Sequence, residues 1–231
     1  MRRIILLNAK GGCGKTTIAT NLASYYASQG RSTTLIDYDP QGSSMKWLSN
    51  RSWERAHIHG IAAFQKPRGA MTRAFQMSVP PGTERVVMDA PAGVAGAQLI
   101  ELVRSVDTII IPVLPSPIDI HAASRFIQEL LLVGKVRSLN IRLGVVANRV
   151  KPNTLVFHAL QRFLKTLHFP LITQLRDSQS YMRAAENGVG IGEIDEARAK
   201  RDCEQWRPLV RWLEDSADTG VRANAASGGS Y

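Results

Sequence analysis

The chain has 231 residues, of which 44% are hydrophobic and 21% charged, and this suits one soluble α/β domain with a buried core. Its two cysteines, Cys13 and Cys203, form no paired motif, which argues against a zinc site, an iron–sulfur cluster and a structural disulfide. The net charge of +10 favours a polyanionic partner, although a merely solvated basic surface is the plainer alternative.

Short apolar runs alternate along the chain with longer amphipathic stretches, which indicates alternating strands and helices. In chain order the predicted elements are a strand over residues 4–7, a helix over 16–28, a strand over 33–36, a helix over 43–48, a strand over 85–88, a helix over 98–104, a strand over 108–111, a helix over 119–133, a strand over 141–147, a helix over 155–167, a strand over 171–174 and helices over 180–186 and 203–214. Residues 50–82 show no clear pattern. The alternation predicts a single doubly wound α/β domain over residues 1–215, with a mostly parallel sheet and helices on both faces.

The two ends of the chain carry weaker signals. The apolar run over residues 4–7 is too short for a signal peptide or a membrane span, so we expect a cytoplasmic protein. From residue 216 the chain is rich in Ala, Gly, Ser and Asn, which predicts a disordered tail over residues 216–231.

A glycine-rich loop lies between the first predicted strand and the first predicted helix, where backbone N–H groups can bind phosphate. Its residues are Lys10, Gly11, Gly12, Cys13, Gly14, Lys15, Thr16 and Thr17. The sequence departs from the strict P-loop pattern at Ala9, where that pattern has Gly. In a P-loop, Lys15 would reach the β- and γ-phosphates and Thr16 would ligate Mg²⁺ through its hydroxyl. The loop therefore predicts a site for ATP and Mg²⁺, with a glycine-rich turn and a chance lysine as the alternative.

Carboxylates follow two of the predicted strands. Asp37 and Asp39 come after the second strand and alternate along an extended backbone, so both can face the same side. Asp89 ends the apolar strand over residues 85–88. The carboxyl ends of parallel strands line the crevice where ligands bind, and phosphoryl transfer needs groups that position water and support the metal. These aspartates are therefore candidate site residues, with simple loop capping as the alternative.

The loop, with its second lysine ahead of the glycines, resembles the deviant Walker A box of the ParA/MinD family of ATPases. The segment over residues 37–42 resembles the family's switch I, Asp-x-Asp-Pro-Gln-Gly. The resemblance implies that Lys10 crosses an ATP-sandwich homodimer to touch the other subunit's nucleotide. It also implies that Asp39 positions the attacking water and that Asp37 supports Mg²⁺ through water.

Two further strand ends resemble the same family. Residues 86–93 are similar to a Walker B strand, which implies that Asp89 holds Mg²⁺ by way of water. Residues 145–149 are similar to the family strand whose asparagine reads the adenine edge, which implies that role for Asn148. A strand-terminal asparagine in a turn is the alternative reading of Asn148.

Several branches of the family are disfavoured. The cysteines do not supply a cluster-binding arrangement, residues 219–225 have no apolar face like the membrane helix of MinD, and no helix-turn-helix precedes the first strand. The small Soj-like ParA branch remains. It implies a slow, partner- and DNA-stimulated ATPase that dimerises with ATP, coats nucleoid DNA without sequence preference and is released by a ParB-like or cargo-adaptor protein.

The cargo in that branch can be a plasmid or chromosome site, or a protein body such as a carboxysome. A membrane-associated regulator of the MinD kind is the alternative function. A non-ATPase scaffold with a vestigial loop is disfavoured by the intact site residues Lys15, Thr16, Asp39 and Asp89. A small-molecule kinase on the same fold is disfavoured by Lys10 and the switch I segment.

Basic residues gather in the last quarter of the chain, where the family's DNA-contacting arginines occur. Non-specific DNA binding needs only lysines and arginines arranged along phosphates. Arg207 and Arg211 are four residues apart and could share a helical face, with Pro208 as a candidate helix start. The candidate DNA-binding residues are Arg176, Arg183, Lys200, Arg201, Arg207 and Arg211.

Overall fold

The protein is described from a computed structural model that covers residues 1–215 except 67–71, 137, 152–153, 168 and 195. The predicted disordered tail, residues 216–231, lies outside the described residues. Seven strands form one sheet in the order β3-β2-β4-β1-β5-β6-β7, and every neighbouring pair is parallel. The strands are β1 (Arg2–Leu6), β2 (Thr33–Asp37), β3 (His59–Ala62), β4 (Arg85–Asp89), β5 (Thr108–Val113), β6 (Arg142–Val150) and β7 (Leu171–Arg176).

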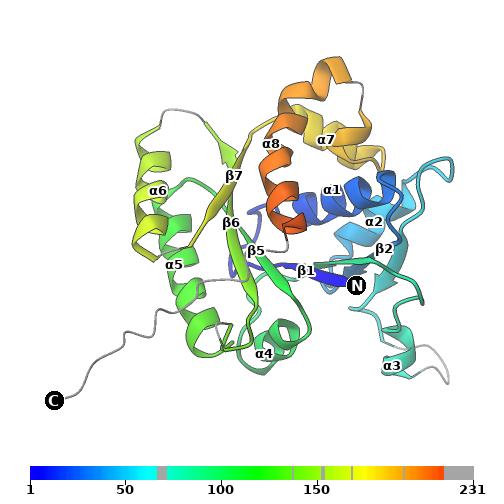
Figure 1. Cartoon of the computed structure of the whole chain (residues 1–231), viewed down its shortest axis with the longest axis horizontal. Helices are drawn as coiled ribbons and strands as arrows, with labels where there is room; N and C mark the ends of the chain where they lie inside the picture. Colours follow the sequence, from blue (N-terminus) through cyan, green and yellow to red (C-terminus); the bar gives the residue numbers. More distant parts are fainter. Residues whose placement is uncertain (67–71, 137, 152–153, 168, 195, 216–231) are drawn as a thin grey trace.

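Helices cover both faces of the sheet, as the alternating pattern predicts (Figure 1). They are α1 (Lys15–Ser28), α2 (Ser43–Ser49), α3 (Arg73–Gln76), α4 (Gly96–Arg104), α5 (Pro117–Leu132), α6 (Leu155–Leu167), α7 (Gln179–Glu186), the 3₁₀ helix η1 (Ile191–Glu193) and α8 (Glu196–Glu214). Buried side chains of α4, α5 and α6 form one core layer, and those of α1, α2 and α8 form the other. Among the described residues, no helix has the length and apolarity to cross a bilayer.

The first strand lies at the centre of the sheet. β1 pairs with β4 on one side and with β5 on the other. The strands β2 to β4 all lie on one side of β1 and the strands β5 to β7 on the other, so the direction in which the sheet is built changes at β1. Neighbouring residues of β1 point to opposite faces: Ile4 and Leu6 pack in the layer of α1, while Ile5 packs in the layer of α5. In doubly wound sheets, ligands bind at the carboxyl end of the strands beside such a reversal. The loop that leaves β1 is at this position.

The segment over residues 50–82, which shows no clear pattern in sequence, contains β3 and α3. β3 is a four-residue edge strand that includes Gly60, where a Cβ would lie 2.5 Å from Leu48 Cδ2. A strand this short with a glycine has too few side chains to show a period of two. Because β3 packs closely against Leu48 of α2, a glycine is favoured at position 60, and this contact between separate elements cannot be read from the local sequence.

The last helix corrects two expectations. α8 begins at Glu196 instead of residue 203, and Pro208 lies inside it instead of starting it. A proline inside a helix costs about 3 kcal/mol or more, which sequence reasoning weighs against such a helix. Trp206, Leu209 and Leu213 are all buried against the sheet layer, and this packing continues the helix past the proline. The sequence also favours inward packing of Trp206, Val210 and Leu213; Trp206 and Leu213 are buried as expected, whereas Val210 is only partly buried.

Candidate functional site

The glycine-rich loop joins the central strand β1 to α1 at the carboxyl edge of the sheet. Gly12 and Gly14 have φ angles of 72° and 100°, which only glycine adopts without strain. Asn8, which sequence reasoning missed, is buried and fixes the start of the loop, because its Oδ1 accepts a hydrogen bond from the Lys10 N–H at 3.1 Å and its Nδ2 donates to the Pro112 carbonyl at 2.6 Å. The loop therefore opens onto the N-terminus of α1, where unpaired N–H groups favour an anion.

Asn148, near the end of β6, supports the same loop through a hydrogen bond to its backbone. Its Nδ2 donates to the carbonyl of Cys13 at 2.8 Å, and its Oδ1 accepts from the N–H of Arg149 at 3.0 Å. Its side chain is buried. The structure thus places Asn148 beside the loop, where it supports the backbone; its contact with adenine stays a prediction.

We expect Gly14→Ala to destroy the loop. The residue has a φ of 100°, and a Cβ there would lie 2.1 Å from Asn148 Nδ2, so both the backbone angle and the packing oppose a side chain. We expect destabilisation of about 1–3 kcal/mol by urea denaturation and loss of nucleotide affinity by calorimetry. Gly30→Ala is the matched control, because Gly30 also has a positive φ of 75° but no atom within 4 Å of its Cβ position. Equal loss of nucleotide affinity in both variants would contradict this account of Gly14.

Lys15 is buried inside the loop that it ends. Its side chain turns back so that Nζ lies 3.1 Å from the carbonyl of Lys10, and the residue is only 7% exposed. The ammonium group is therefore enclosed by the same backbone that presents N–H groups to an anion. Lys10 itself is only partly buried.

Asp89 and Asp37 end neighbouring parallel strands, β4 and β2, and are paired in register. The Oδ2 atom of Asp89 accepts hydrogen bonds from Thr16 Oγ1 and Ser44 Oγ, both at 2.7 Å. Its Oδ1 atom is buried and has no hydrogen-bond partner among the described residues. Burial raises the pKa of Asp89 to about 6, against the two hydroxyl hydrogen bonds, which favour the charged form.

The unpartnered oxygen of Asp89 tests whether a metal fits. A buried carboxylate oxygen without a partner is costly, and a nearby cation or its bound water would satisfy it. The oxygens of the Asp89 carboxylate and of the Thr16 hydroxyl bonded to it are the ligand type that Mg²⁺ prefers. The residues therefore fit a magnesium ion at this point.

The switch segment after β2 is shaped by its own two aspartates. Asp37 accepts hydrogen bonds from the N–H groups of Asp39 at 3.0 Å and Met45 at 3.1 Å, one on each carboxylate oxygen. Burial raises the pKa of Asp37 in spite of these bonds. Asp39 is only partly buried and accepts from the N–H of Gln41 at 3.0 Å. The segment is thus held at the site, while the roles of Asp37 and Asp39 toward metal and water stay predictions.

The candidate DNA-binding residues divide into separate groups. Lys200, Arg207 and Arg211 line one groove of about 740 Å³ between α1 and α8, since they recur on one face of α8. Arg201 and Arg183 are exposed outside that groove. Arg176 forms an ion pair with the buried Asp202, so its charge is already compensated. The structure brings three of the six together; DNA contact by any of them stays a prediction.

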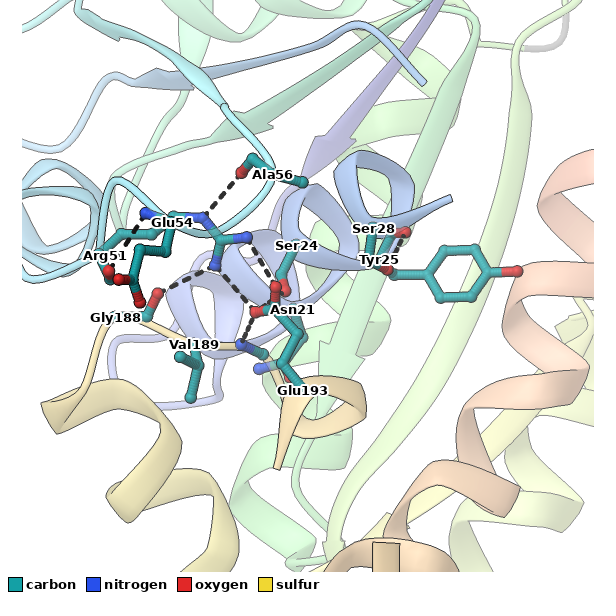
Figure 2. Close-up of polar contacts among 12 residues, drawn as sticks. Asn21, Ser24, Tyr25, Ser28, Arg51, Glu54, Ala56, Gly188, Val189 and Glu193 are labelled. Carbon is teal, nitrogen blue, oxygen red and sulfur yellow. Dashed lines mark hydrogen bonds and ion pairs between the residues drawn. The ribbon is translucent and has the colours of Figure 1, made fainter. Parts of the chain in front are cut away.

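A buried ion pair, missed in the sequence, joins the end of α2 to η1 (Figure 2). Arg51 binds both carboxylate oxygens of Glu193, at 2.7 and 2.8 Å, and the two side chains are 4% and 7% exposed. Burial alone would raise the pKa of Glu193, but hydrogen bonds from Arg51, Ser24 and the Gly190 N–H hold this pKa below its ordinary value. The pair spans 142 residues of sequence, so no local pattern could reveal it.

The glycine-rich loop joins the central parallel strand to its helix and contains a buried lysine, Lys15. An aspartate, Asp89, ends the strand beside it in the sheet. This combination defines a P-loop nucleotide-binding protein. The chain belongs to the CobQ/CobB/MinD/ParA nucleotide-binding domain family, whose sequence profile matches residues 4–191. This confirms the family resemblance and the fold class expected from the motifs.

Known relatives place the chain more closely within that family. It is 31% identical over 195 residues to the maintenance of carboxysome distribution protein A of Halothiobacillus neapolitanus, which covers 83% of this chain and 87% of the relative. It is 30% identical over 192 residues to the protein of the same name from Gloeobacter kilaueensis, with 82% and 83% covered. The structure of a plasmid partition protein of Borrelia burgdorferi, solved with AMPPNP, superimposes on this chain with a TM-score of 0.67. The superposition covers 91% of this chain and 99% of that one at 17% sequence identity, and it shows that the two share a fold.

Proposed function

We propose that the protein is a slow ATPase that dimerises with ATP, binds DNA without sequence preference and positions an intracellular cargo in the cytoplasm. A ParB-like or cargo-adaptor protein would release it from the nucleoid by stimulating hydrolysis. The observation that carries the proposal is the P-loop with its two lysines, beside a buried Asp89 oxygen that has no described partner. Similarity to two carboxysome distribution proteins favours a protein body of that kind as the cargo over a plasmid or chromosome site.

The proposed chemistry follows from the positions of four side chains. Thr16 and Asp89 would hold Mg²⁺, the second through water, and the ion would neutralise charge on the phosphates. Lys15 would bind the β- and γ-phosphates from inside the loop. Asp39, which lies on the held but partly exposed switch segment, would orient the attacking water.

Dimerisation with ATP is proposed for Lys10. The residue is the first of the loop and remains partly exposed, whereas Lys15 is enclosed. An ammonium in that position can reach a nucleotide held by a second copy of the chain. The lysine-to-phosphate contact would then form only when both subunits hold ATP, which links dimerisation to the nucleotide state.

Binding to DNA is proposed for the basic wall of the groove between α1 and α8. Lys200, Arg207 and Arg211 would contact phosphates there, and the net charge of +10 supports such a footprint. Arg183 and Arg201 would add to it from exposed positions nearby. Arg176 contributes least, because Asp202 compensates its charge.

The test is the affinity for random-sequence double-stranded DNA, measured by fluorescence anisotropy over a series of salt concentrations. We expect tight binding with Mg-ATP and weak binding with ADP. The double variant Arg207→Ala/Arg211→Ala should lower the slope of log affinity against log salt by about two, since each phosphate contact adds about one. The control is Arg125→Ala/Lys165→Ala, which removes two exposed charges from helices on the opposite face of the sheet. Equal affinity with ATP and ADP, or equal loss in the control, would refute the DNA proposal.

A further inference from the structure

The Asp89 carboxylate is held from one side only. Two hydroxyls, Thr16 Oγ1 and Ser44 Oγ, donate to the same oxygen, Oδ2, each at 2.7 Å. The other oxygen, Oδ1, is buried without a partner among the described residues. A carboxylate turns freely about its last torsion unless something fixes it. Two donors on one oxygen therefore determine which oxygen is left for a ligand.

The two hydroxyls differ in what else they can do. Thr16 lies in the P-loop, where its hydroxyl can give its proton to Asp89 and its lone pair to a metal. Ser44 lies outside the P-loop, on α2, and is fully buried with 0% exposure. Its Oγ has Asp89 Oδ2 as its acceptor. Within the part of the chain that the structure describes, the Ser44 hydroxyl thus acts on the carboxylate alone.

The helix that presents Ser44 is held at both ends. At its start, the Met45 N–H donates to Asp37 at the end of β2, at 3.1 Å. Near its end, Trp47 Nε1 donates to the Val189 carbonyl at 3.3 Å, and Arg51 follows with its buried ion pair to Glu193 (Figure 2). A hydroxyl on a support fixed at both ends orients its acceptor better than one on a free loop.

We propose that Ser44 is a positioning residue for magnesium: it fixes Oδ2 of Asp89 so that Oδ1 faces the metal-bound water. The proposal rests on the magnesium site of the proposed function and adds to it a residue that does not touch the metal. Hydrogen-bonding partners of this kind typically change metal affinity by about 10–100-fold when removed.

The test measures Mg²⁺ binding without hydrolysis. The affinity of ADP is determined by calorimetry in EDTA and over a Mg²⁺ titration, for the wild type, Ser44→Ala and Ser43→Ala. Ser43 is the matched control, because it is the neighbouring serine on α2 but is exposed. We expect Ser44→Ala to weaken the apparent Mg²⁺ affinity by about 10-fold or more, with ADP affinity in EDTA unchanged and Ser43→Ala like the wild type.

The outcomes separate this inference from the function on which it rests. A wild type whose ADP affinity does not depend on Mg²⁺ would refute the proposed magnesium site itself. A wild type that depends on Mg²⁺, together with an unchanged Ser44→Ala, would overturn the role of Ser44. Equal losses with and without Mg²⁺ would show a structural role only, and would also overturn it. If Ser44→Ala does not fold, Ser44→Cys, with a weaker donor of similar shape, takes its place under the same criteria.

Discussion

Lys15→Ala is expected to lower the rate of ATP hydrolysis by about 10²–10³-fold, the usual cost of removing one preorganised donor to a developing charge. The effect should be large because the ammonium group is enclosed by the loop, with Nζ 3.1 Å from the Lys10 carbonyl and 7% of the residue exposed. Electrostatic interactions are stronger in such a poorly solvated place than at the surface. Phosphate release measures the rate, and calorimetry should show that nucleotide affinity falls too.

Two other lysines make this prediction specific. Lys46→Ala removes an exposed charge on α2 and should leave both measurements near the wild type. Lys10→Ala should preserve nucleotide binding by the monomer but weaken the ATP-dependent dimer in light scattering. Wild-type hydrolysis in Lys15→Ala would remove the phosphate loop from the proposed mechanism, and an unchanged dimer in Lys10→Ala would remove the second lysine from the interface.

Arg51→Ala is expected to lower the free energy of unfolding by about 3–5 kcal/mol, the cost of breaking a buried ion pair by removing one partner. Glu193 would keep its hydrogen bonds from Ser24 and Gly190 but lose both guanidinium contacts while remaining 7% exposed. The same change removes a donor to the carbonyl of Ala56, in the loop between α2 and β3, and a donor to the carbonyl of Gly188, before η1. Urea denaturation followed by circular dichroism gives the value.

The matched control is Arg55→Ala, since Arg55 is an exposed arginine four residues further on. It should change the free energy of unfolding by no more than about 0.5 kcal/mol. The double variant Arg51→Met/Glu193→Met should recover part of the loss, because it leaves no buried charge unpaired. A loss below about 1 kcal/mol in Arg51→Ala would mean that the pair is solvated in the native protein.

Local signals account for the parts of the fold and site that the sequence predicts well. The strands β1, β4 and β5 contain continuous apolar runs, β2 is a short β-branched run, and the loop before α1 carries its glycines and lysine side by side. Asp37 and Asp89 are placed by the rule that parallel strands end at one edge, and the structure sets them in register.

Contacts between distant residues account for the parts that it does not predict. Ser44 and Ser43 look equivalent in sequence, and only the approach of α2 to β4 makes one of them a partner of Asp89. Asn148 meets Cys13 across 135 residues, and Arg51 meets Glu193 across 142. Proline rules favour Pro208 as the start of a helix, whereas α8 runs through Pro208 with Leu209 buried on the sheet side.

The central place of β1 has a consequence for synthesis on the ribosome. This strand is made before the other six strands of the sheet, yet its two neighbours are β4 and β5, and the loop that follows it is braced by Asn148. Chains emerge at about 5–20 residues per second and fold as their domains become available. In a nascent chain the hydrogen bond from Asn148 to this loop therefore cannot form until the end of β6 has left the exit tunnel. Before β4 and β5 emerge, the apolar side chains of β1, which pack into the two core layers of the folded protein, stay exposed to solvent.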